Sequence, residues 1–240
     1  MRFLVTAGNT REMIDRVRDW GNIFTGNTGF AIARALAEVG EVTLLTSNRA
    51  HLEEAKSLKA AHPIHAVGFT SHAQLKAALA ERVTRERFDG IFMTAAVADY
   101  APRRTYAVLE RRADPAHQGE EIWRVRDVQA EKVRSTHAQI AVLGERTEKL
   151  VDLFRREWGY RGLLVKFKLE VGLSRKQLSE IGQQSRRASD ADFLVANTLE
   201  MVEGAGAGAY LLGEGVEEFV PRGELPARLV RVVEDVIRDS

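Results

Sequence analysis

Short apolar runs alternate with longer amphipathic segments along most of this chain, and the alternation predicts its elements. We expect four strands in the first hundred residues, at positions 2–6, 41–47, 63–69 and 90–97. Helix-prone segments stand between them, at positions 25–40, 51–59 and 71–87. The run 90–97 is apolar enough to be buried on both faces, which is typical of a strand in a parallel sheet.

The alternation continues in the second half of the chain. A strand is predicted at 162–172, a helix at 173–189 and another strand at 191–197. A hairpin at 209–220, turning at 213–215, and a closing helix at 225–239 complete the pattern. We therefore predict a single α/β domain, residues 1–240, with a doubly wound, mostly parallel Rossmann-like sheet and helices on both faces.

One segment departs from this pattern. Between residues 99 and 132 the sequence is rich in charge and contains two β-prone pieces, at 105–110 and 121–127. This composition favours an inserted β-ribbon arm, which we place at 103–131. A long insertion without a core of its own usually covers a site or docks on another subunit, and the alternative is a solvated loop.

Composition narrows the class of protein. With 45% apolar and 29% charged residues, the 240-residue chain is of the globular class. Lys and Arg number 35 against 34 Asp and Glu, so the basic balance expected of a nucleic-acid binder is missing. The lack of cysteine excludes disulfides and thiolate metal ligands and suits the cytoplasm. The N-terminal apolar run is about five residues long, against roughly 20 for a membrane span, so we expect no membrane segment or signal peptide.

The first strand, loop and helix are typical of an anion site, because the N–H groups that begin a helix have no partner inside it. We expect Thr25 to cap this helix and Gly40 to lie just past its end. Ligands of open parallel sheets bind beyond the carboxyl ends of the strands. The candidate residues at these ends are Gly8, Asn9, Thr10, Ser47, Asn48, residues 95–99, residues 167–170 and Asn197.

The signatures of several common sites are absent. The first strand is followed by GNT in place of G-x-G-x-x-G, and the second ends in TSN without an acidic residue, so the dinucleotide fingerprint fails. The chain has neither a P-loop nor a G-x-S-x-G elbow. His62 and His65 lack the helix and acidic partner of a metalloprotease, so we expect strand-edge residues there and predict no protein metal ligands.

Six separated motifs are similar, in order and spacing, to those of one enzyme family. They are LVTAGNTREMIDRVR, NIFTGNTG, AAVADY, KVRS, VKFKLEVG and ADFLVANT. Together they resemble the phosphopantothenate-cysteine ligase (phosphopantothenoylcysteine synthetase) family over nearly the whole chain. The resemblance implies the free-standing form of the synthetase. In many bacteria the family is fused behind a flavin-dependent decarboxylase, which we expect here as a separate protein.

The resemblance implies a ligase of coenzyme A biosynthesis. The family activates the carboxylate of 4′-phosphopantothenate with a nucleotide, usually CTP in bacteria, and forms an acyl-cytidylate and pyrophosphate. It then couples the acyl group to the amine of L-cysteine and releases CMP. Mg²⁺ carried by the nucleotide, a homodimer and a cytoplasmic location are implied as well, and the arm at 103–131 corresponds to the projecting arm of the family dimer.

The resemblance also assigns roles to individual residues. Asn22 corresponds to the asparagine that assists turnover of the acyl-nucleotide, and Lys132 to the lysine that neutralises the triphosphate, with Arg134 as a second cation. Asp99 corresponds to an aspartate that contacts the nucleotide, and Phe167 to a phenylalanine near the base. The remaining assignments are the backbone of Met93, Thr94 and Ala95 beside the base, and Gly8, Thr10, Gly26 and Gly29 at the phosphates.

Several positions depart from the family pattern. Asn9 replaces the second glycine of G-G-T, Asn27 replaces a lysine, and Thr198 replaces the aspartate of A-N-D. Two helix lysines of many members align with Ser185 and Ser189. These differences leave the choice between CTP and ATP open, and the cysteine site is not placed. Two alternatives stay open: an NAD(P)-dependent reductase and a non-catalytic nucleotide-binding relative.

Overall fold

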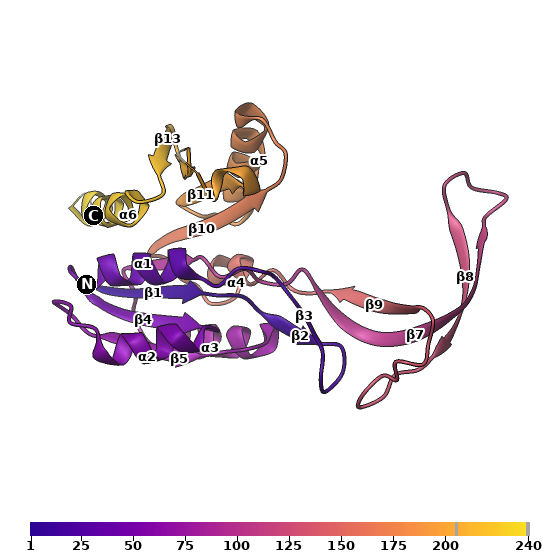
Figure 1. Ribbon diagram of the computed structural model, residues 1–240. Coiled ribbons are helices and arrows are strands. Elements are labelled where there is room, and N and C mark those ends of the chain that lie inside the picture. Colours follow the sequence, from indigo (N-terminus) through magenta and orange to yellow (C-terminus); the bar gives the residue numbers. More distant parts are fainter. Residues whose placement is uncertain (205, 239–240) are drawn as a thin grey trace.

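A central sheet organises the computed structural model, which describes residues 1–204 and 206–238 (Figure 1). The sheet has eight strands in the order β13-β12-β11-β10-β6-β1-β4-β5. Their bounds are β1 Arg2–Ala7, β4 Glu41–Thr46, β5 Ile64–Gly68, β6 Gly90–Met93, β10 Leu163–Glu170, β11 Phe193–Thr198, β12 Gly208–Gly213 and β13 Val216–Pro221.

The direction of winding reverses in the middle of this sheet. From β1 the chain builds outward through β4 to β5, and it then returns to place β6, β10 and β11 on the other side. These six strands are parallel, while β12 and β13 add an antiparallel hairpin at the edge. The predicted doubly wound, mostly parallel fold is confirmed. Its switch point lies between β1 and β6, where ligands of such sheets bind.

Helices cover both faces of the sheet because successive strand side chains point to opposite sides. On one face, Val5 belongs to a core with α1 (Asn27–Leu36), α2 (Arg49–Ser57) and α6 (Leu225–Arg238). On the other face, Leu4 packs with α3 (His72–Arg85) and α4 (Leu150–Arg156). The helix α5 (Arg175–Ala188) covers β11 and β12. The closing helix was expected to reach residue 239, which lies outside the described residues.

Local chemistry explains where several elements begin and end. Ser174 caps α5 in a capping box with Gln177, as its sequence favours. The expected cap of α1 at Thr25 is wrong, because the N-cap residue is Gly26, which has no side chain to donate or accept. The strand expected at 90–97 ends at Met93. Beyond it the regular pairing stops, because the Ala95 N–H donates to the Thr6 hydroxyl of β1 and the Ala98 N–H donates to the Thr10 hydroxyl in the loop after β1.

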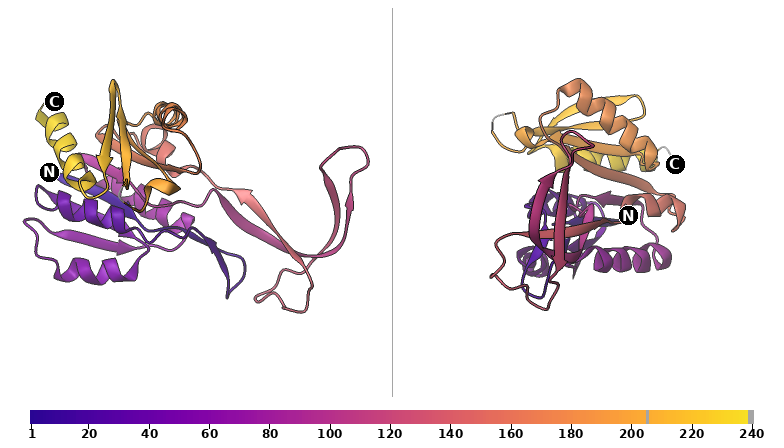
Figure 2. Two further views of the ribbon diagram at one scale, coloured as in Figure 1. Left: turned by 45° about the horizontal axis from the view of Figure 1, so that its top comes forward. Right: turned by 90° about the vertical axis from the view of Figure 1, so that its right-hand side faces the viewer.

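The predicted arm exists and is longer than expected. It is a three-stranded antiparallel sheet of β8 (Glu121–Asp127), β7 (Tyr100–Ala113) and β9 (Ile140–Arg146) in that order. Two views show β7 and β8 projecting far from the central sheet (Figures 1 and 2). The strand β9 was not predicted, nor were α4, the short hairpin of β2 (Arg11–Met13) and β3 (Asp19–Gly21), and the 3₁₀ turn η1 (Leu199–Met201). Within the described residues, every helix is too short or too polar to cross a membrane.

Candidate functional site

A cavity of about 520 Å³ opens at the switch point. Its wall combines the loop after β1, the start of α1, the loop after β6 and the carboxyl end of β10. Nine of the residues assigned from the sequence line it together: Gly8, Asn22, Gly26, Gly29, Met93, Thr94, Ala95, Asp99 and Phe167. All but Met93 and Thr94 come from four of the separated motifs, so folding brings residues far apart in sequence to one place.

Glycines let the start of α1 approach the β1 loop. A Cβ on Gly26 would lie 2.0 Å from the backbone nitrogen of Gly8, and the φ angle of Gly26 is +83°. A Cβ on Gly29 would lie 2.1 Å from Thr94 Oγ1. Because only a residue without a side chain fits at both places, the first N–H groups of α1 come directly to the cavity wall. This arrangement suits a phosphate group.

Asparagines connect the loops that form the cavity mouth. The Asn22 amide nitrogen donates to the Ala96 carbonyl at 3.3 Å, and the Asn22 carbonyl accepts a hydrogen bond from the Asn9 side chain. The Asn9 backbone N–H donates to Ser47 Oγ at 2.9 Å. The loops after β1, β4 and β6 are therefore linked through side-chain hydrogen bonds, and the exposed Asn22 amide stands at the cavity wall.

Thr10 does not reach the cavity. It is fully buried, and its Oγ1 accepts a hydrogen bond from the Ala98 backbone N–H at 2.8 Å. The Thr10 N–H donates to the Ala96 carbonyl at 3.1 Å. Thr10 therefore holds the loop that carries Asp99, and the direct phosphate contact expected of it is not what this structure shows.

Lys132 and Arg134 also lie outside the cavity wall, with exposed side chains. Between them, the Val133 N–H donates to the carboxylate of Asp15 at 3.1 Å, and the Arg18 guanidinium donates to the same carboxylate at 2.6 Å. Burial raises the pKa of Asp15, but these donors, with the Val17 N–H, outweigh it and hold the pKa well below its ordinary value. Asp15 thus ties the segment around Lys132 to the first loop.

The cavity has a positive wall, of which the sequence-based candidates included only Lys168, within residues 167–170. Five cationic side chains line it, against the two carboxylates of Asp99 and Glu148. The five are Arg146, Lys149, Lys166, Lys168 and Arg222. One signal was present in the sequence, because Lys166 interrupts the apolar run LLVKF within the strand predicted at 162–172. A lysine at such a place is rarely buried without a partner.

Lys166 is the buried member of this wall, with only 4% of its surface exposed. Its ammonium donates to the Ser185 carbonyl at 3.1 Å, to Ser185 Oγ at 3.0 Å and to Ser189 Oγ at 2.7 Å. Burial lowers the pKa of Lys166 to about 8, and the neighbouring charge of Lys149 adds to this effect. The two serines that replace family lysines are thus the partners of a lysine on β10.

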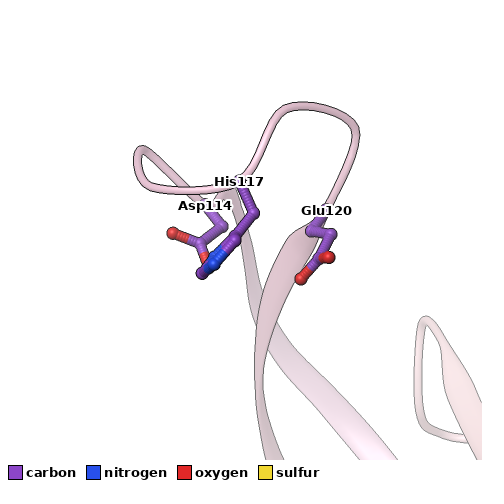
Figure 3. A group of neighbouring side chains, drawn as sticks. All are labelled: Asp114, His117 and Glu120. Atoms are coloured by element: carbon purple, nitrogen blue, oxygen red, sulfur yellow. The ribbon is translucent and has the colours of Figure 1, made fainter.

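A group of potential metal ligands lies at the tip of the arm (Figure 3), and its residues are not among those that line the cavity. The side chains are Asp114, His117 and Glu120, with ligand atoms within 4.8 Å of one another. The Asp114 carboxylate accepts hydrogen bonds from the Ala116 N–H at 2.9 Å and from the His117 ring at 3.1 Å. These bonds hold Asp114 and His117 together in the loop between β7 and β8.

Fold and site together define a class: a doubly wound α/β protein with a cation-lined cavity at its switch point and an extended β-arm. Comparison with known proteins specifies this class further. Residues 1–114 match the model of the family described as DNA/pantothenate metabolism flavoprotein C-terminal domain. The resemblance of this chain to the phosphopantothenate-cysteine ligase family is thereby confirmed.

The curated relatives of this chain are named as proteins of coenzyme A biosynthesis. The chain is 27% identical over 240 residues to the coenzyme A biosynthesis bifunctional protein CoaBC of Thermococcus kodakarensis, covering 98% of this chain and 51% of that protein. It is 35% identical over 136 residues to CoaBC of Mycolicibacterium smegmatis, covering 56% of this chain and 31% of the relative. The chain thus spans about half the length, or less, of these relatives.

Solved structures show the same fold. The DNA/pantothenate metabolism flavoprotein of Streptococcus pneumoniae matches with a TM-score of 0.77 at 24% identity, over 98% of this chain and 99% of that one. The C-terminal domain of a CoaBC protein matches with a TM-score of 0.67 at 23% identity, over 100% of this chain and 96% of that one. A Cab2 mutant in complex with phosphopantothenate-cysteine has a TM-score of 0.67 at 15% identity, over 99% and 88%.

Proposed function

We propose that this chain is a phosphopantothenate-cysteine ligase, which couples 4′-phosphopantothenate to L-cysteine through an acyl-nucleotide and uses CTP. The observation that carries the proposal is the convergence of Asn22, Asp99 and Phe167, from three separated motifs, on one cavity at the switch point. The family match over residues 1–114 and the relatives named for coenzyme A biosynthesis support it.

The cavity offers what the first step needs. A carboxylate oxygen of 4′-phosphopantothenate attacks the α-phosphorus of the nucleotide, and the bond from this phosphorus to the pyrophosphate oxygen breaks. The charge of the departing pyrophosphate is held by N–H groups at the start of α1 and by the cationic wall. Lys132 and Arg134 remain predicted contributors whose exposed side chains stand on the segment tied to Asp15.

The second step is acyl transfer. The amine of L-cysteine attacks the acyl carbon, the bond to the nucleotide phosphate oxygen breaks, and the nucleoside monophosphate leaves. The carbonyl oxygen gains negative charge on the way, and a positioned amide donor stabilises such charge. The Asn22 amide nitrogen stands at the wall and holds only a long bond of 3.3 Å to Ala96, which it is able to exchange for the substrate.

The cavity wall also offers groups for the base of the nucleotide and for the metal ion that the nucleotide carries. The backbone of residues 93–95 presents donors and acceptors to the base edge, and the Phe167 ring offers a stacking surface worth about 1–3 kcal/mol. A Mg²⁺ ion bound together with the nucleotide would neutralise phosphate charge. No protein ligand of such an ion was predicted from the sequence, but these ions take one or two protein carboxylates and keep several waters, and the exposed carboxylate of Asp99 at the wall would fit this need.

The arm supports a homodimer. Its strands expose several large apolar side chains to solvent, an arrangement that a second copy of the chain would cover. These side chains are Tyr100, Leu109, Ile122, Trp123, Val125, Ile140 and Leu143. A projecting sheet with little core of its own gains stability from such a contact.

Pyrophosphate release tests the proposed reaction. We expect release from CTP that depends on 4′-phosphopantothenate, and formation of the coupled product only when L-cysteine is added. The Asn22→Ala variant should form the acyl-nucleotide and lower the rate of cysteine coupling about 100-fold, because it loses one oxyanion donor. The Lys132→Ala variant tests the predicted cation and should lose turnover.

The control is Lys56→Ala, which removes a positive charge from an exposed ion pair with Glu53 on α2, outside the cavity. This variant should behave as the wild type. Folded protein that releases no pyrophosphate from either CTP or ATP would contradict the proposal. Release from ATP alone would mean that the enzyme uses ATP instead of CTP.

A further inference from the structure

The buried lysine of the cavity wall is partnered by neutral groups and lies beside a second cation. The three hydrogen bonds of Lys166 go to hydroxyl and carbonyl oxygens, and no carboxylate of the described residues pairs with it within 4 Å. Lys149 lines the same cavity, and its positive charge repels that of Lys166. Lys166 is buried and the Lys149 side chain is half exposed, and two like charges so close to one another are unfavourable unless an anion lies between them.

The nearby acidic and basic groups do not remove this imbalance. Asp152 of α4 lies 3.7 Å from the Lys149 ammonium, but its carboxylate also accepts a hydrogen bond from Ser189 Oγ at 2.6 Å. Lys168, on the same strand as Lys166, is paired with Glu170 at 2.7 Å. One carboxylate is therefore shared by Lys149 and the serine that binds Lys166.

Ser185 offers a donor toward the same corner. Its Oγ accepts a hydrogen bond from Lys166, and in the described contacts its own hydroxyl hydrogen is not used. Ser185 is half-buried and lines the cavity. An anion at this corner would therefore meet a hydroxyl donor and the Lys149 ammonium, with the charge of Lys166 directly behind the hydroxyl.

We propose that Lys166, Lys149 and Ser185 form an anion-binding corner of the cavity, which takes a terminal phosphate group of the nucleotide. The assignment of this phosphate to the nucleotide rests on the proposed function, whereas the anion-binding corner rests on the geometry alone. Lys166 acts as a positioning residue, because it orients the Ser185 hydroxyl and supplies charge through it. Phosphate groups suit a point charge of this kind combined with a hydroxyl donor.

A purely structural role for Lys166 is the alternative. Ser185 lies in the last turn of α5, where carbonyl groups carry partial negative charge and attract a cation. A lysine that only caps this helix would stabilise the fold and leave anion binding unchanged. Proton uptake separates the two roles, because an anion favours the charged form of a lysine whose pKa is about 8, and a helix cap does not respond to the ligand.

The experiment is calorimetric titration of the whole chain with inorganic pyrophosphate at about pH 8, in two buffers of different ionisation enthalpy. The wild type should take up about half a proton more per pyrophosphate than Lys166→Met, because about half of this lysine is neutral at its pKa. The variant should bind about tenfold more weakly at about pH 7, and the difference should shrink as the pH rises above 9 and the wild-type lysine loses its charge.

Lys56→Met is the matched control and should bind as the wild type does. Equal affinity and equal proton uptake in the wild type and in Lys166→Met would overturn the proposal. Should Lys166→Met fail to fold, Ser185→Ala and Lys149→Met carry the affinity test, and the proton uptake of the wild type by itself carries the uptake test. The wild type must then take up more protons on binding than the ionisation of pyrophosphate itself accounts for. Proton uptake that does not exceed this amount would also overturn the proposal.

Further titrations identify the source of the phosphate. Lys166→Met should weaken CTP binding and leave 4′-phosphopantothenate binding unchanged, and the reverse result would overturn the assignment to the nucleotide. These binding measurements need no turnover. A protein that binds pyrophosphate at this corner but never couples cysteine would disprove the proposed function and keep the anion site.

Discussion

At the scale of single residues, absent side chains shape the cavity as much as the side chains that line it. Gly26 and Gly29 allow the first turn of α1 to touch the loop after β1 and Thr94 after β6. The resemblance identified both glycines, but the reason for them is a contact between segments. Thr10 shows the converse, because a residue expected at the ligand is buried and holds a loop.

We predict that Gly26→Ala costs about 3 kcal/mol of stability or more and disrupts the anion site, because its Cβ would overlap the backbone of Gly8. Gly159→Ala is the matched control, since Gly159 also has a positive φ, +62°, but open space around its Cβ. The control should lose about 1 kcal/mol. Urea unfolding measures both, and equal losses would show that backbone strain alone, not the close approach, makes glycine necessary.

At the scale of elements, a few buried polar side chains connect loops that carry the predicted chemistry. Asp15 accepts hydrogen bonds from its own loop and from Val133, and so joins the hairpin of β2 and β3 to the segment between β8 and β9. The sequence predicted a polar loop here and a basic motif at Lys132, without any link between them. The link sets where Lys132 stands relative to the cavity.

We predict that Asp15→Asn loosens residues 131–134, so their amide hydrogens exchange faster, while those of the central sheet keep their protection. Asp19→Asn, which removes an exposed carboxylate 3.7 Å from Arg11, is the control and should change little. The folded pKa of Asp15 lies below its ordinary value of 3.8, so its contribution to stability is present above that pH. It should be lost as the pH falls below this value in the wild type and be missing from Asp15→Asn. An unchanged exchange pattern would refute the link.

At the scale of the whole molecule, the central sheet and the arm differ in how they bury apolar side chains. The central sheet carries a continuous core on each face. The arm of β7, β8 and β9 projects from this sheet (Figure 2). Its strands leave large apolar side chains exposed. The cavity begins where the arm leaves the sheet, because Asp99 and Arg146 at the base of the arm both line it. Contact between arms would therefore bear directly on the site.

We predict that the wild type is a dimer at micromolar concentration and that Leu143→Glu shifts it to the monomer, because a charge cannot be buried in an apolar contact without a partner. Leu143 on β9 is 47% exposed. Phe219→Glu on β13, where the side chain is 44% exposed and lies off the arm, is the control and should remain dimeric. Gel filtration with light scattering measures both. A monomeric wild type would contradict the proposed assembly.

The amino-acid sequence by itself determined the succession of elements, because burial on one or two faces leaves a periodic pattern along the chain. The parallel strands, the two-sided helix cover, the edge hairpin and an arm near residues 103–131 follow from it. The sequence motifs also marked Asn22, Asp99 and Phe167. All three lie at strand ends or in adjoining loops, and strand ends meet in such a sheet.

Only the tertiary structure decided which polar residues meet. Lys166 is held by serines 19 and 23 residues further along the chain, Asp15 by Val133 118 residues away, and β9 by pairing with β7. A local pattern reports the period and polarity of a segment but not its partner. A buried lysine or carboxylate depends on its partner, because it is stable inside a protein only where a distant segment supplies its hydrogen bonds.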